Sequence, residues 1–416
     1  MNKNLTTITI NQNKDNSKIK SSGRYAFDKS KSIKNKIENN FFIKEINTIE
    51  GLYEFYKIPY EIYPEDSFWV PPFWKIIKDF FKNENPFWNH AETKLFIAYK
   101  KSHPVGRIAA FIDHKYCKKI DKKIGFFGFF ECIKDYKIAS KLFKITEKWL
   151  KANNISIIQG PIDGRVDMGC GFLLKGFESP STIMSPFSPK YYLSFCRRYG
   201  FQKNRDMMEF KIDLKKQLPR ILKKSAEKSE KKDIKIKNFS KLRSKEFIDK
   251  WSKLFLDTFS KHWGFVPVSK KEVKYRFEVK YARLLADPKL FLIAELQKKP
   301  IAYIWATPDY NPVFRKMKGK IGLKQILQFI YFYKNIKRGK LHLIGCVKKH
   351  RNKKMANYLN YLVLKEMKKR KYEEATIGPV DENNSAARNI LKKMDAEVYK
   401  KHRIFEKKIQ KEKEGT

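Results

Sequence analysis

Two segments of the chain recur in the same order, and this internal repeat constrains the fold more strongly than any single motif. Residues 95–109 resemble residues 290–304, and an offset of 196 places Pro104 opposite Pro300. Each segment consists of an apolar run, a short polar turn and a second apolar run, a pattern typical of a β-hairpin. The repeat indicates two copies of one structural unit.

A second match follows each hairpin. Gly160-Pro161 ends one apolar run and Gly378-Pro379 ends another, and both runs are predicted strands. A helix, a short turn and a closing strand are then expected in each copy. Their predicted ranges are 191–199, 200–201 and 207–212 in the first copy, and 385–394, 395–396 and 402–409 in the second. Two matches in one order, with the same elements downstream, favour duplication.

The second copy is longer between its hairpin and its Gly-Pro strand, and residues 307–340 are the predicted insertion. Its core, 314–334, combines basic residues with a dense apolar stretch that is too short to span a bilayer. One interpretation is a helix resting on an anionic membrane surface. Two alternatives are a cover over a long acyl chain and a buried helix that packs the two copies together.

Composition shifts divide the chain into five parts. Residues 1–40 form a polar tail without periodicity, 41–212 the first domain, 213–233 a charged connecting helix, 234–410 the second domain, and 411–416 a short tail. Strands and helices alternate within each domain. This order predicts an α/β structure of the mixed-sheet α+β type, with an open sheet.

The net charge is large but does not select a partner. The chain has 91 basic and 44 acidic residues, a formal charge of +47. One interpretation is a polyanion such as nucleic acid, an anionic membrane or a phosphorylated cofactor. The other is nucleotide composition, because the chain is rich in Lys, Asn, Ile, Phe and Tyr together, as products of AT-rich genomes are. The lysines are spread along the sequence, which favours the second interpretation.

Cysteine usage and hydropathy indicate a reducing compartment. The five cysteines are widely spaced and form no C-x-x-C pair, so neither a disulfide framework nor a zinc site is expected. The N-terminal residues lack the apolar core of a signal peptide. No window approaches 18 apolar residues, the length that would suggest a membrane span. We therefore expect a cytoplasmic protein, with peripheral contact at the inner membrane face as an option.

The closing segment 383–399 resembles the end of the GNAT (GCN5-related N-acetyltransferase) fold, with Asn384 as the helix N-cap. Further stretches resemble a bacterial family of tandem GNAT-like proteins, over residues 41–410. They are 63–72, 85–92, 106–110 (beginning Gly106-Arg107), 125–131, 160–161, 176–177, 191–192, 262–267 (beginning His262-Trp263) and 308–311.

The resemblance implies two tandem GNAT folds and transfer of an acyl group from acyl-CoA, or an acyl carrier protein, to an amine. The family includes proteins similar to bacterial ceramide synthases, which implies a lipid amine as one acceptor and a small amine as another. Acyl-CoA would act as co-substrate, and no prosthetic group or metal is implied. Nucleic acid is not an expected partner.

The GNAT phosphate cradle reads R/Q-x-x-G-x-G/A, at a helix start where backbone N–H groups and the helix dipole favour anions. In the second copy Arg351 and Ala356 match this pattern, while Lys354 replaces the first glycine. A side chain there crowds the close approach that glycine permits. These three residues and Asn384 are the predicted cofactor-binding residues. Residues 129–139 of the first copy lack the pattern. The alternative is a basic helix start in solvent.

Three residues of the first copy are predicted to be catalytic. Glu131 ends an aromatic strand, where desolvation would raise its pKa and suit a general base. Asp163 follows Gly160-Pro161 at a strand end, where open sheets bind ligands. Tyr192 begins the last helix, the place of a thiolate-protonating tyrosine in many GNAT enzymes. The alternatives are a capping acid, a turn-stabilising aspartate and a packing aromatic residue.

Four residues are predicted to bind substrate. His90 and Glu92 are interpreted as a polar pair that shapes the acceptor site, although ordinary structural roles are the alternative. Arg107 belongs to a matched motif, and Tyr191 adjoins Tyr192.

Two other functions stay open. The chain could be a decayed GNAT scaffold that binds an anionic surface or nucleic acid, which Lys354 and the net charge favour, although no nucleic-acid motif supports it. It could also be an aminoacyl-tRNA-dependent transferase, since tandem GNAT folds occur in such enzymes. The preferred hypothesis is one composite site shared by two diverged copies.

Overall fold

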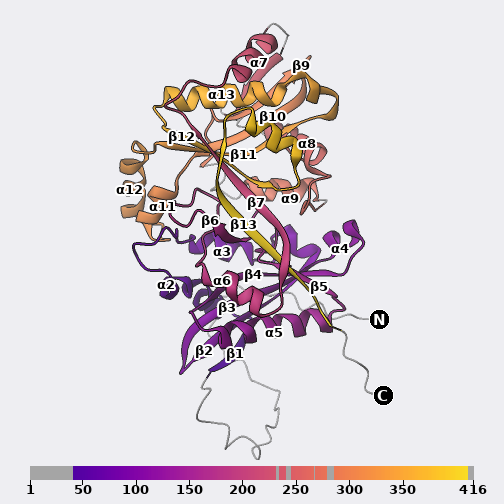
Figure 1. Cartoon of the computed structure of the whole chain (residues 1–416), viewed down its shortest axis with the longest axis vertical. Helices are drawn as coiled ribbons and strands as arrows, with labels where there is room; N and C mark the ends of the chain where they lie inside the picture. Colours follow the sequence, from indigo (N-terminus) through magenta and orange to yellow (C-terminus); the bar gives the residue numbers. More distant parts are fainter. Residues whose placement is uncertain (1–40, 231–233, 240–244, 267, 279–284, 411–416) are drawn as a thin grey trace, which may run out of the picture.

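The computed structural model describes residues 41–230, 234–239, 245–266, 268–278 and 285–410. The predicted tails, 1–40 and 411–416, lie outside these ranges. The described residues form a single mixed sheet flanked by helices, which confirms the predicted fold class (Figure 1).

Each copy contributes its own run of strands. Those of the first copy are β1 (Phe41–Ile46), β2 (Ala91–Lys100), β3 (His103–Asp113), β4 (Ile124–Cys132), β5 (Ile157–Gly160), β6 (Phe172–Lys175) and β7 (Gln202–Asp213). Those of the second are β8 (Ile234–Asn238), β9 (Phe291–Leu296), β10 (Lys299–Pro308), β11 (Arg338–Cys346), β12 (Glu374–Asp381) and β13 (Glu397–Lys408).

Helices connect these strands. Those before β8 are α1 (Ile49–Lys57), α2 (Pro59–Ile62), α3 (Trp74–Phe80), α4 (His114–Ile120), α5 (Tyr136–Ala152), α6 (Tyr191–Arg198) and α7 (Arg220–Glu230), with the 3-10 helix η1 (Pro86–Asn89). Those after β8 are α8 (Lys245–Phe259), α9 (Lys270–Glu278), α11 (Asn311–Met317), α12 (Leu323–Tyr333), α13 (Met355–Lys369) and α14 (Ser385–Lys392), with the 3-10 helix η3 (Lys348–Lys353).

The repeated hairpins have the same local geometry in both copies. β2 pairs with β3, and β9 pairs with β10, each antiparallel. Both turns consist of two residues with positive φ, which are Lys101-Ser102 and Gln297-Lys298. Such turns match the twist of the strands that they join. The predicted hairpins are therefore confirmed.

The closing strands are exchanged between the copies. The sheet order is β1-β2-β3-β4-β5-β13-β7-β12-β11-β10-β9-β8, with β6 beside β13. Thus β13, from the end of the chain, pairs with β5 of the first copy, while β7 pairs with β12 of the second. The two closing strands pair with each other and run along the middle of the molecule (Figure 1). The division at 213–233 thus separates two copies in the sequence but not two sheets.

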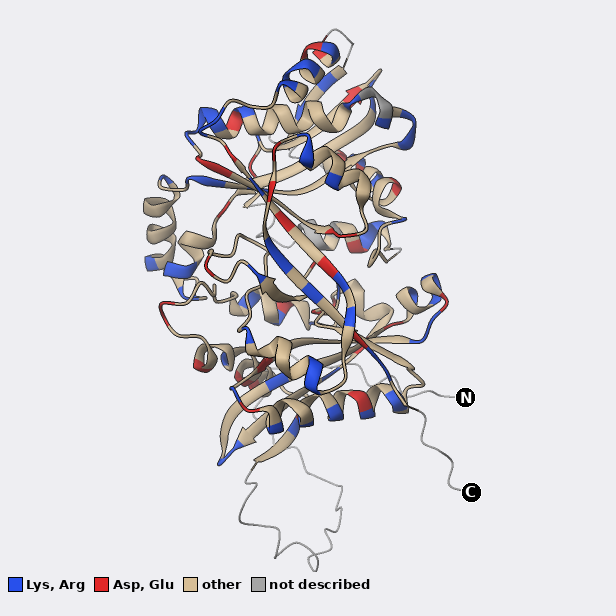
Figure 2. Cartoon of the chain, viewed as in Figure 1, with Lys and Arg blue, Asp and Glu red and all other residues tan. Residues whose placement is uncertain are grey.

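A buried ion pair lies on the exchanged strands. Glu209 on β7 and Lys340 on β11 are both fully buried, and Lys340 Nζ donates to Glu209 Oε2 at 2.8 Å. Tyr399 of β13 donates to the same oxygen at 2.9 Å, and Ser185 donates to the other. Acidic and basic segments meet on the crossing strands in Figure 2. The pair therefore joins strands from both copies.

The charges around Glu209 decide its protonation state. Burial by itself raises the pKa of this carboxyl group. The charges of Lys340 and His402, with hydrogen bonds from Lys340 and Ser185, outweigh burial and lower the pKa to about 2. Glu209 is thus an anion inside the sheet.

The connecting segment and the insertion differ in how they pack. α7 is shorter than the predicted 213–233, because β7 continues to Asp213 and Pro219 precedes the helix. α7 buries Leu222 and Ala226 in the core of the second copy. In the insertion, α11 buries Val313 and its neighbours, whereas no residue of α12 is buried. A buried helix packing the copies together therefore describes α11 but not α12.

Replacing Lys340 by methionine should destabilise the protein strongly. Lys340→Met leaves Glu209 buried without its counter-charge, and breaking such a pair typically costs about 3–5 kcal/mol. Urea unfolding followed by circular dichroism measures the loss. Lys408→Met, at an exposed position on β13, should change stability little.

Two further results should accompany that loss. The double variant Glu209→Gln/Lys340→Met should recover most of the stability, because no buried charge is left unpaired. Since the pKa of Glu209 lies below the ordinary 4.5, its contribution should be complete above pH 4.5 and disappear as the pH falls toward 2. An unchanged unfolding free energy in Lys340→Met would contradict this account.

Candidate functional site

A polar cluster surrounds Glu131 at the end of β4. Tyr63 and Tyr192 each donate a hydrogen bond to Glu131 Oε2, at 3.0 and 2.8 Å. Arg107 Nη2 lies 4.0 Å from Glu131 Oε1, and the carboxylate side chain is 12% exposed. The structure therefore brings together Glu131, Tyr192 and Arg107, which the sequence predicted separately.

Asp163 lies on the other side of the same strand end. Its Oδ1 accepts a hydrogen bond from the N–H of Phe129 at 2.6 Å, where β4 is kinked by a positive φ at Phe129. Arg107 influences Asp163 through its charge. Asp163 and Glu131 therefore lie on either side of one guanidinium group.

Burial makes both carboxyl groups weaker acids. Desolvation raises the pKa of Glu131 to about 7, against opposing effects of Arg107, Tyr192 and Tyr63. Desolvation also raises the pKa of Asp163 to about 6, against the Phe129 N–H and Arg107. A carboxyl group that titrates near pH 7 can accept and return a proton at neutral pH, which a general base requires.

Arg107 keeps one donor unused. Its Nη1 donates to the carbonyl of Phe55 at 2.7 Å, and its guanidinium group lies over the Phe55 ring. Its buried Nε has no hydrogen-bond partner within the described part of the chain. An unpaired buried donor is costly, so this arrangement of Arg107 is held at the expense of one hydrogen bond.

In the first copy, hydrogen bonds close the end of β4 and the gap between β4 and β5. Tyr191 donates to the carbonyl of Cys132 at 2.8 Å, and Tyr192 accepts from its N–H at 2.9 Å. The gap between β4 and β5 is bridged, because the N–H of Ile162 donates to the carbonyl of Phe127 at 2.7 Å. Asp135 caps α5, and this carboxylate would repel a phosphate.

In the second copy the corresponding strands separate. β11 and β12 pair from Arg338 to Leu341, and no backbone hydrogen bond joins them beyond that point in the described structure. Past the last pair, Leu343 on β11 and Val380 on β12 are half-buried. β11 continues beside β10, whereas β12 continues beside β7. This opening between parallel strands is the one that could admit an extended ligand.

The predicted phosphate cradle follows that opening. Residues 348–353 form η3, and Lys354 has φ 58° before α13 begins at Met355. Lys354 thus adopts the left-handed backbone that the glycine of the pattern would supply. Arg351 is exposed and donates through Nε to the carbonyl of Cys346 at 3.1 Å. Ala356 is half-buried in the first turn of α13.

Asn384 acts as the N-cap of α14, as predicted. Its Oδ1 accepts the N–H of Ala387 at 3.1 Å. The side-chain oxygen of Asn384 is thus occupied by the cap. The role of this residue in binding a cofactor stays a prediction.

His90 and Glu92 do not form a pair. His90 is buried, with Nδ1 3.0 Å from Asp113 and Nε2 3.3 Å from Glu272 of α9. Glu92 contacts His114 Nε2 at 2.7 Å on the surface. The side chains diverge because His90 ends η1 and packs under α9, whereas Glu92 lies on β2. His90 therefore joins the two copies instead of lining the Glu131 cluster.

A loop of the second copy lies between the two candidate regions. Gly264 has φ 71°, and a Cβ there would lie 2.4 Å from Val166, in the loop that carries Asp163. Partial desolvation lowers the pKa of His262, and the positive charge of Arg351 is the second-largest cause of this shift. Residues 262–264 thus contact the Asp163 loop on one side and lie within electrostatic reach of the cradle on the other.

Sequence reasoning missed Tyr63, Asp135 and His262. Tyr63 and His262 lie in stretches that match the tandem GNAT-like family, but neither stretch carried an assigned role. Asp135 carries a local signal, since an aspartate directly before a helical pattern is a typical N-cap. Within the described ranges, no group of three metal-ligating side chains could hold an ion, and no helix is long and apolar enough to cross a bilayer.

Comparison with known proteins identifies the fold. No protein-family model matches the chain. A tandem GNAT protein from the clavulanic acid biosynthesis pathway superposes with a TM-score of 0.50 at 8% identity, covering 89% of this chain and 99% of that one. A GCN5-related glucosamine N-acetyltransferase region of a fungal β-N-acetylglucosaminidase gives 0.54 at 12% identity, covering 89% and 38%. The chain has a tandem GNAT fold.

Two curated proteins are similar over nearly their whole length. Protein YghO of Escherichia coli (strain K12) is 26% identical over 365 residues, which cover 85% of this chain and 92% of that protein. A bacterial ceramide synthase of Caulobacter vibrioides (strain NA1000 / CB15N) is 24% identical over 373 residues, covering 88% and 96%. The name of the second relative states a synthase activity, whereas the name of the first states none.

Replacing Lys354 by glycine should stabilise the protein. A lysine at φ 58° pays the steric cost of the left-handed region, about 1–2 kcal/mol, which glycine avoids. We expect Lys354→Gly to raise the free energy of unfolding by up to about 1 kcal/mol in urea titration, since glycine also loses more entropy on folding. The matched change Lys349→Gly, inside η3, should lower it. A loss of stability in Lys354→Gly would contradict the assigned backbone conformation.

Proposed function

We propose that this protein transfers an acyl group from acyl-CoA, or from an acyl carrier protein, to an amine. The observation that carries the proposal is the Glu131 carboxyl group, which is nearly buried and hydrogen-bonded by two tyrosines, and whose pKa is raised to about 7. The tandem GNAT fold and the relative named bacterial ceramide synthase support the same reaction class.

In the proposed reaction the amine nitrogen attacks the thioester carbonyl carbon. A C–N bond forms and the C–S bond breaks, so that an amide and a thiol result. The proton lost by the amine passes to Glu131, whose carboxylate is a competent acceptor at neutral pH. The departing sulfur takes a proton from Tyr192, which recovers one from Glu131 across their 2.8 Å hydrogen bond.

Two features support this proton relay. Burial raises the pKa of Tyr192 well above its usual value, so a free tyrosinate would not accumulate and the two transfers would occur together. The guanidinium group of Arg107, with Nη2 4.0 Å from Glu131, is a positive charge near the oxygen on which negative charge develops. Asp163 helps to hold the backbone of β4 at Phe129.

For the donor, we propose that the second copy binds the CoA phosphates. Its strands β11 and β12 separate, and the helix start that follows carries Arg351 and Lys354. In the first copy Asp135 occupies the corresponding helix start. The site is then composite: phosphates on one copy, proton transfer on the other, with residues 262–264 between them.

For the acceptor, we propose a long-chain lipid amine. The relative from Caulobacter carries the name ceramide synthase. Aromatic side chains extend from the cluster, since Tyr63 stacks on Trp69 at 4.8 Å and Trp69 contacts Tyr60 at 5.1 Å. Tyr60 in turn donates to the carbonyl of Lys318, at the base of the insertion. An apolar chain could lie along such a wall.

A decayed scaffold is the second candidate, and Lys354 is the observation that favours it. Phosphates approach the backbone most closely at the glycine of the pattern. At this position the side chain of Lys354 stands in place of the glycine hydrogen atom. Steeply salt-dependent binding to nucleic acid, together with no binding of CoA, would decide for this function.

Replacing Glu131 by glutamine should abolish most of the activity. Loss of a general base typically lowers kcat about 10²- to 10⁴-fold. Thiol release from palmitoyl-CoA, with and without a sphingoid base, measures the reaction. The wild-type rate should rise with pH through about 7, because only the carboxylate accepts a proton, and Glu131→Gln should lack this rise.

Glu92→Gln is the matched control, because Glu92 lies on the surface and contacts only His114 among the described side chains. Its rate should equal that of the wild type. Thiol release that does not depend on an amine, or full activity in Glu131→Gln, would overturn the proposed role.

Charge reversal should show which copy holds the CoA phosphates. Arg351→Glu should weaken binding of CoA at least tenfold, because a carboxylate replaces a cation beside the diphosphate. Lys134→Glu, at the corresponding helix start of the first copy, should leave it unchanged. Titration calorimetry with CoA measures both. The reverse pattern would assign the phosphates to the first copy.

A further inference from the structure

The helix α12 presents its most apolar face to solvent. Leu323, Leu327, Ile330 and Tyr331 are 77%, 60%, 59% and 70% exposed, and Ile326 is 49% exposed. These positions follow the spacing i, i+3, i+4, i+7, i+8, so they form one continuous stripe on the helix. In an amphipathic helix on the surface of a globular protein, such an apolar stripe normally faces the protein core.

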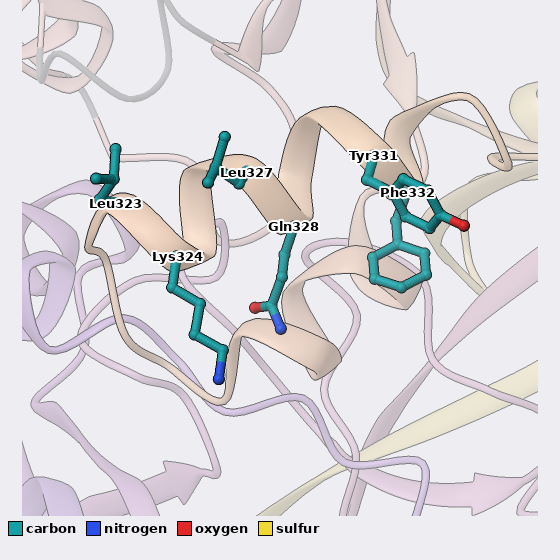
Figure 3. Close-up of a pocket in the computed structure, with 6 residues that line it drawn as sticks. All are labelled: Leu323, Lys324, Leu327, Gln328, Tyr331 and Phe332. Atoms are coloured by element: carbon teal, nitrogen blue, oxygen red, sulfur yellow. The ribbon is translucent and has the colours of Figure 1, made fainter.

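The opposite face of α12 holds the helix on the protein. Phe329 packs against Tyr310 and Phe314, with ring centroids 5.7 and 6.4 Å apart. Figure 3 shows Leu323 and Leu327 pointing away from the side that bears Lys324 and Gln328. The helix is therefore attached through one face while a second apolar face is left uncovered.

The base of the helix is fixed to the first copy. Gly319 has φ 70°, and a Cβ there would lie 2.3 Å from the hydroxyl of Tyr60. Phe314 of α11 packs edge-on against Phe73 at 5.0 Å. The stripe thus has a defined orientation relative to the aromatic wall that reaches Glu131.

The charge around the stripe has one sign. The sequence contains no Asp or Glu from residue 310 to residue 365. Exposed lysines flank the apolar stripe: Lys320 precedes it, Lys324 lies in the first turn of α12, and Lys334 and Lys337 follow it. Lys318, which precedes α12, pairs with Glu65 of the first copy at 2.8 Å. In Figure 2 the helix is drawn in tan and blue only.

We propose that α12 docks this protein on the surface of an anionic phospholipid bilayer. The apolar stripe would lie at the boundary of headgroups and acyl chains, with the flanking lysines on lipid phosphates, the arrangement of interfacial amphipathic helices. An open depression of about 480 Å³ along the helix, lined by Leu323, Leu327, Tyr331 and Phe332 among others, offers room for part of an acyl chain.

A second copy of the chain fits this surface less well. A helix of 11 residues is about 16 Å long, so its exposed face offers roughly 200 Å², against about 800 Å² per partner in a standard interface. Pairing two such faces would also bring lysines against lysines without intervening acids. A bilayer supplies both the apolar depth and the negative charge.

The double variant Leu327→Gln/Ile330→Gln should lose membrane binding. Co-sedimentation of the full chain with phosphatidylglycerol/phosphatidylcholine vesicles should show a partition coefficient at least tenfold lower than that of the wild type. Lys320→Gln/Lys324→Gln should weaken binding to these vesicles and make it less sensitive to salt. Met184→Gln, a large exposed apolar position outside the insertion, is the matched control and should bind as the wild type does.

The outcomes separate docking from catalysis. Transfer to a short, water-soluble amine should be unchanged in Leu327→Gln/Ile330→Gln, so failure of the proposed chemistry would not be mistaken for failure of docking. Wild-type protein that stays in the supernatant, or equal sedimentation of the double variant, overturns the proposal. A dimer in light scattering that this variant dissociates would assign the stripe to a second copy instead.

Discussion

The antiparallel ladder between β7 and β13 is the interaction on which the rest of the structure depends. It joins residues 202–211 to residues 397–406, and each strand also completes the half of the sheet that belongs to the other copy. Both copies are therefore needed to complete either half. The ladder also accommodates a buried anion, because Glu209 of β7 is neutralised by Lys340 of β11 and hydrogen-bonded by Tyr399 of β13. The register of β7, β11 and β13 relative to one another therefore depends on this charge pair as well as on hydrophobic burial.

Much of the local structure was readable in the sequence, but the exchange of strands was not. The hairpins at Lys101-Ser102 and Gln297-Lys298 follow from apolar runs around short polar turns. The closing helix α14 follows from its N-cap Asn384, and α6 from its matching place in the repeat. The sequence does not indicate which strand each closing strand pairs with. β7 and β13 alternate similarly between apolar and polar residues, so either could pair with β5. Periodicity does not distinguish these two pairings. That choice depends on long-range contacts such as Glu209 with Lys340.

The site was predictable one residue at a time and unpredictable as an arrangement. Glu131, Asp163, Arg107 and Tyr192 were each expected from strand ends and matched motifs, and the structure gathers them around one guanidinium group. Proximity in sequence misled for His90 and Glu92, because tertiary packing under α9 outweighs their spacing. The raised pKa of Glu131 was expected from its aromatic strand, whereas its hydrogen bonds from Tyr63 and Tyr192 join segments far apart in the sequence and were not.

The order of β5 and β13 along the chain has a consequence for synthesis on the ribosome. The edge of β5 pairs with β13, which emerges from the ribosome long after β5 itself. Until then the nascent first half lacks the final partner of that edge, and an open strand edge promotes pairing with other chains. The exchange of closing strands therefore lengthens the time for which the nascent protein is exposed to misassembly.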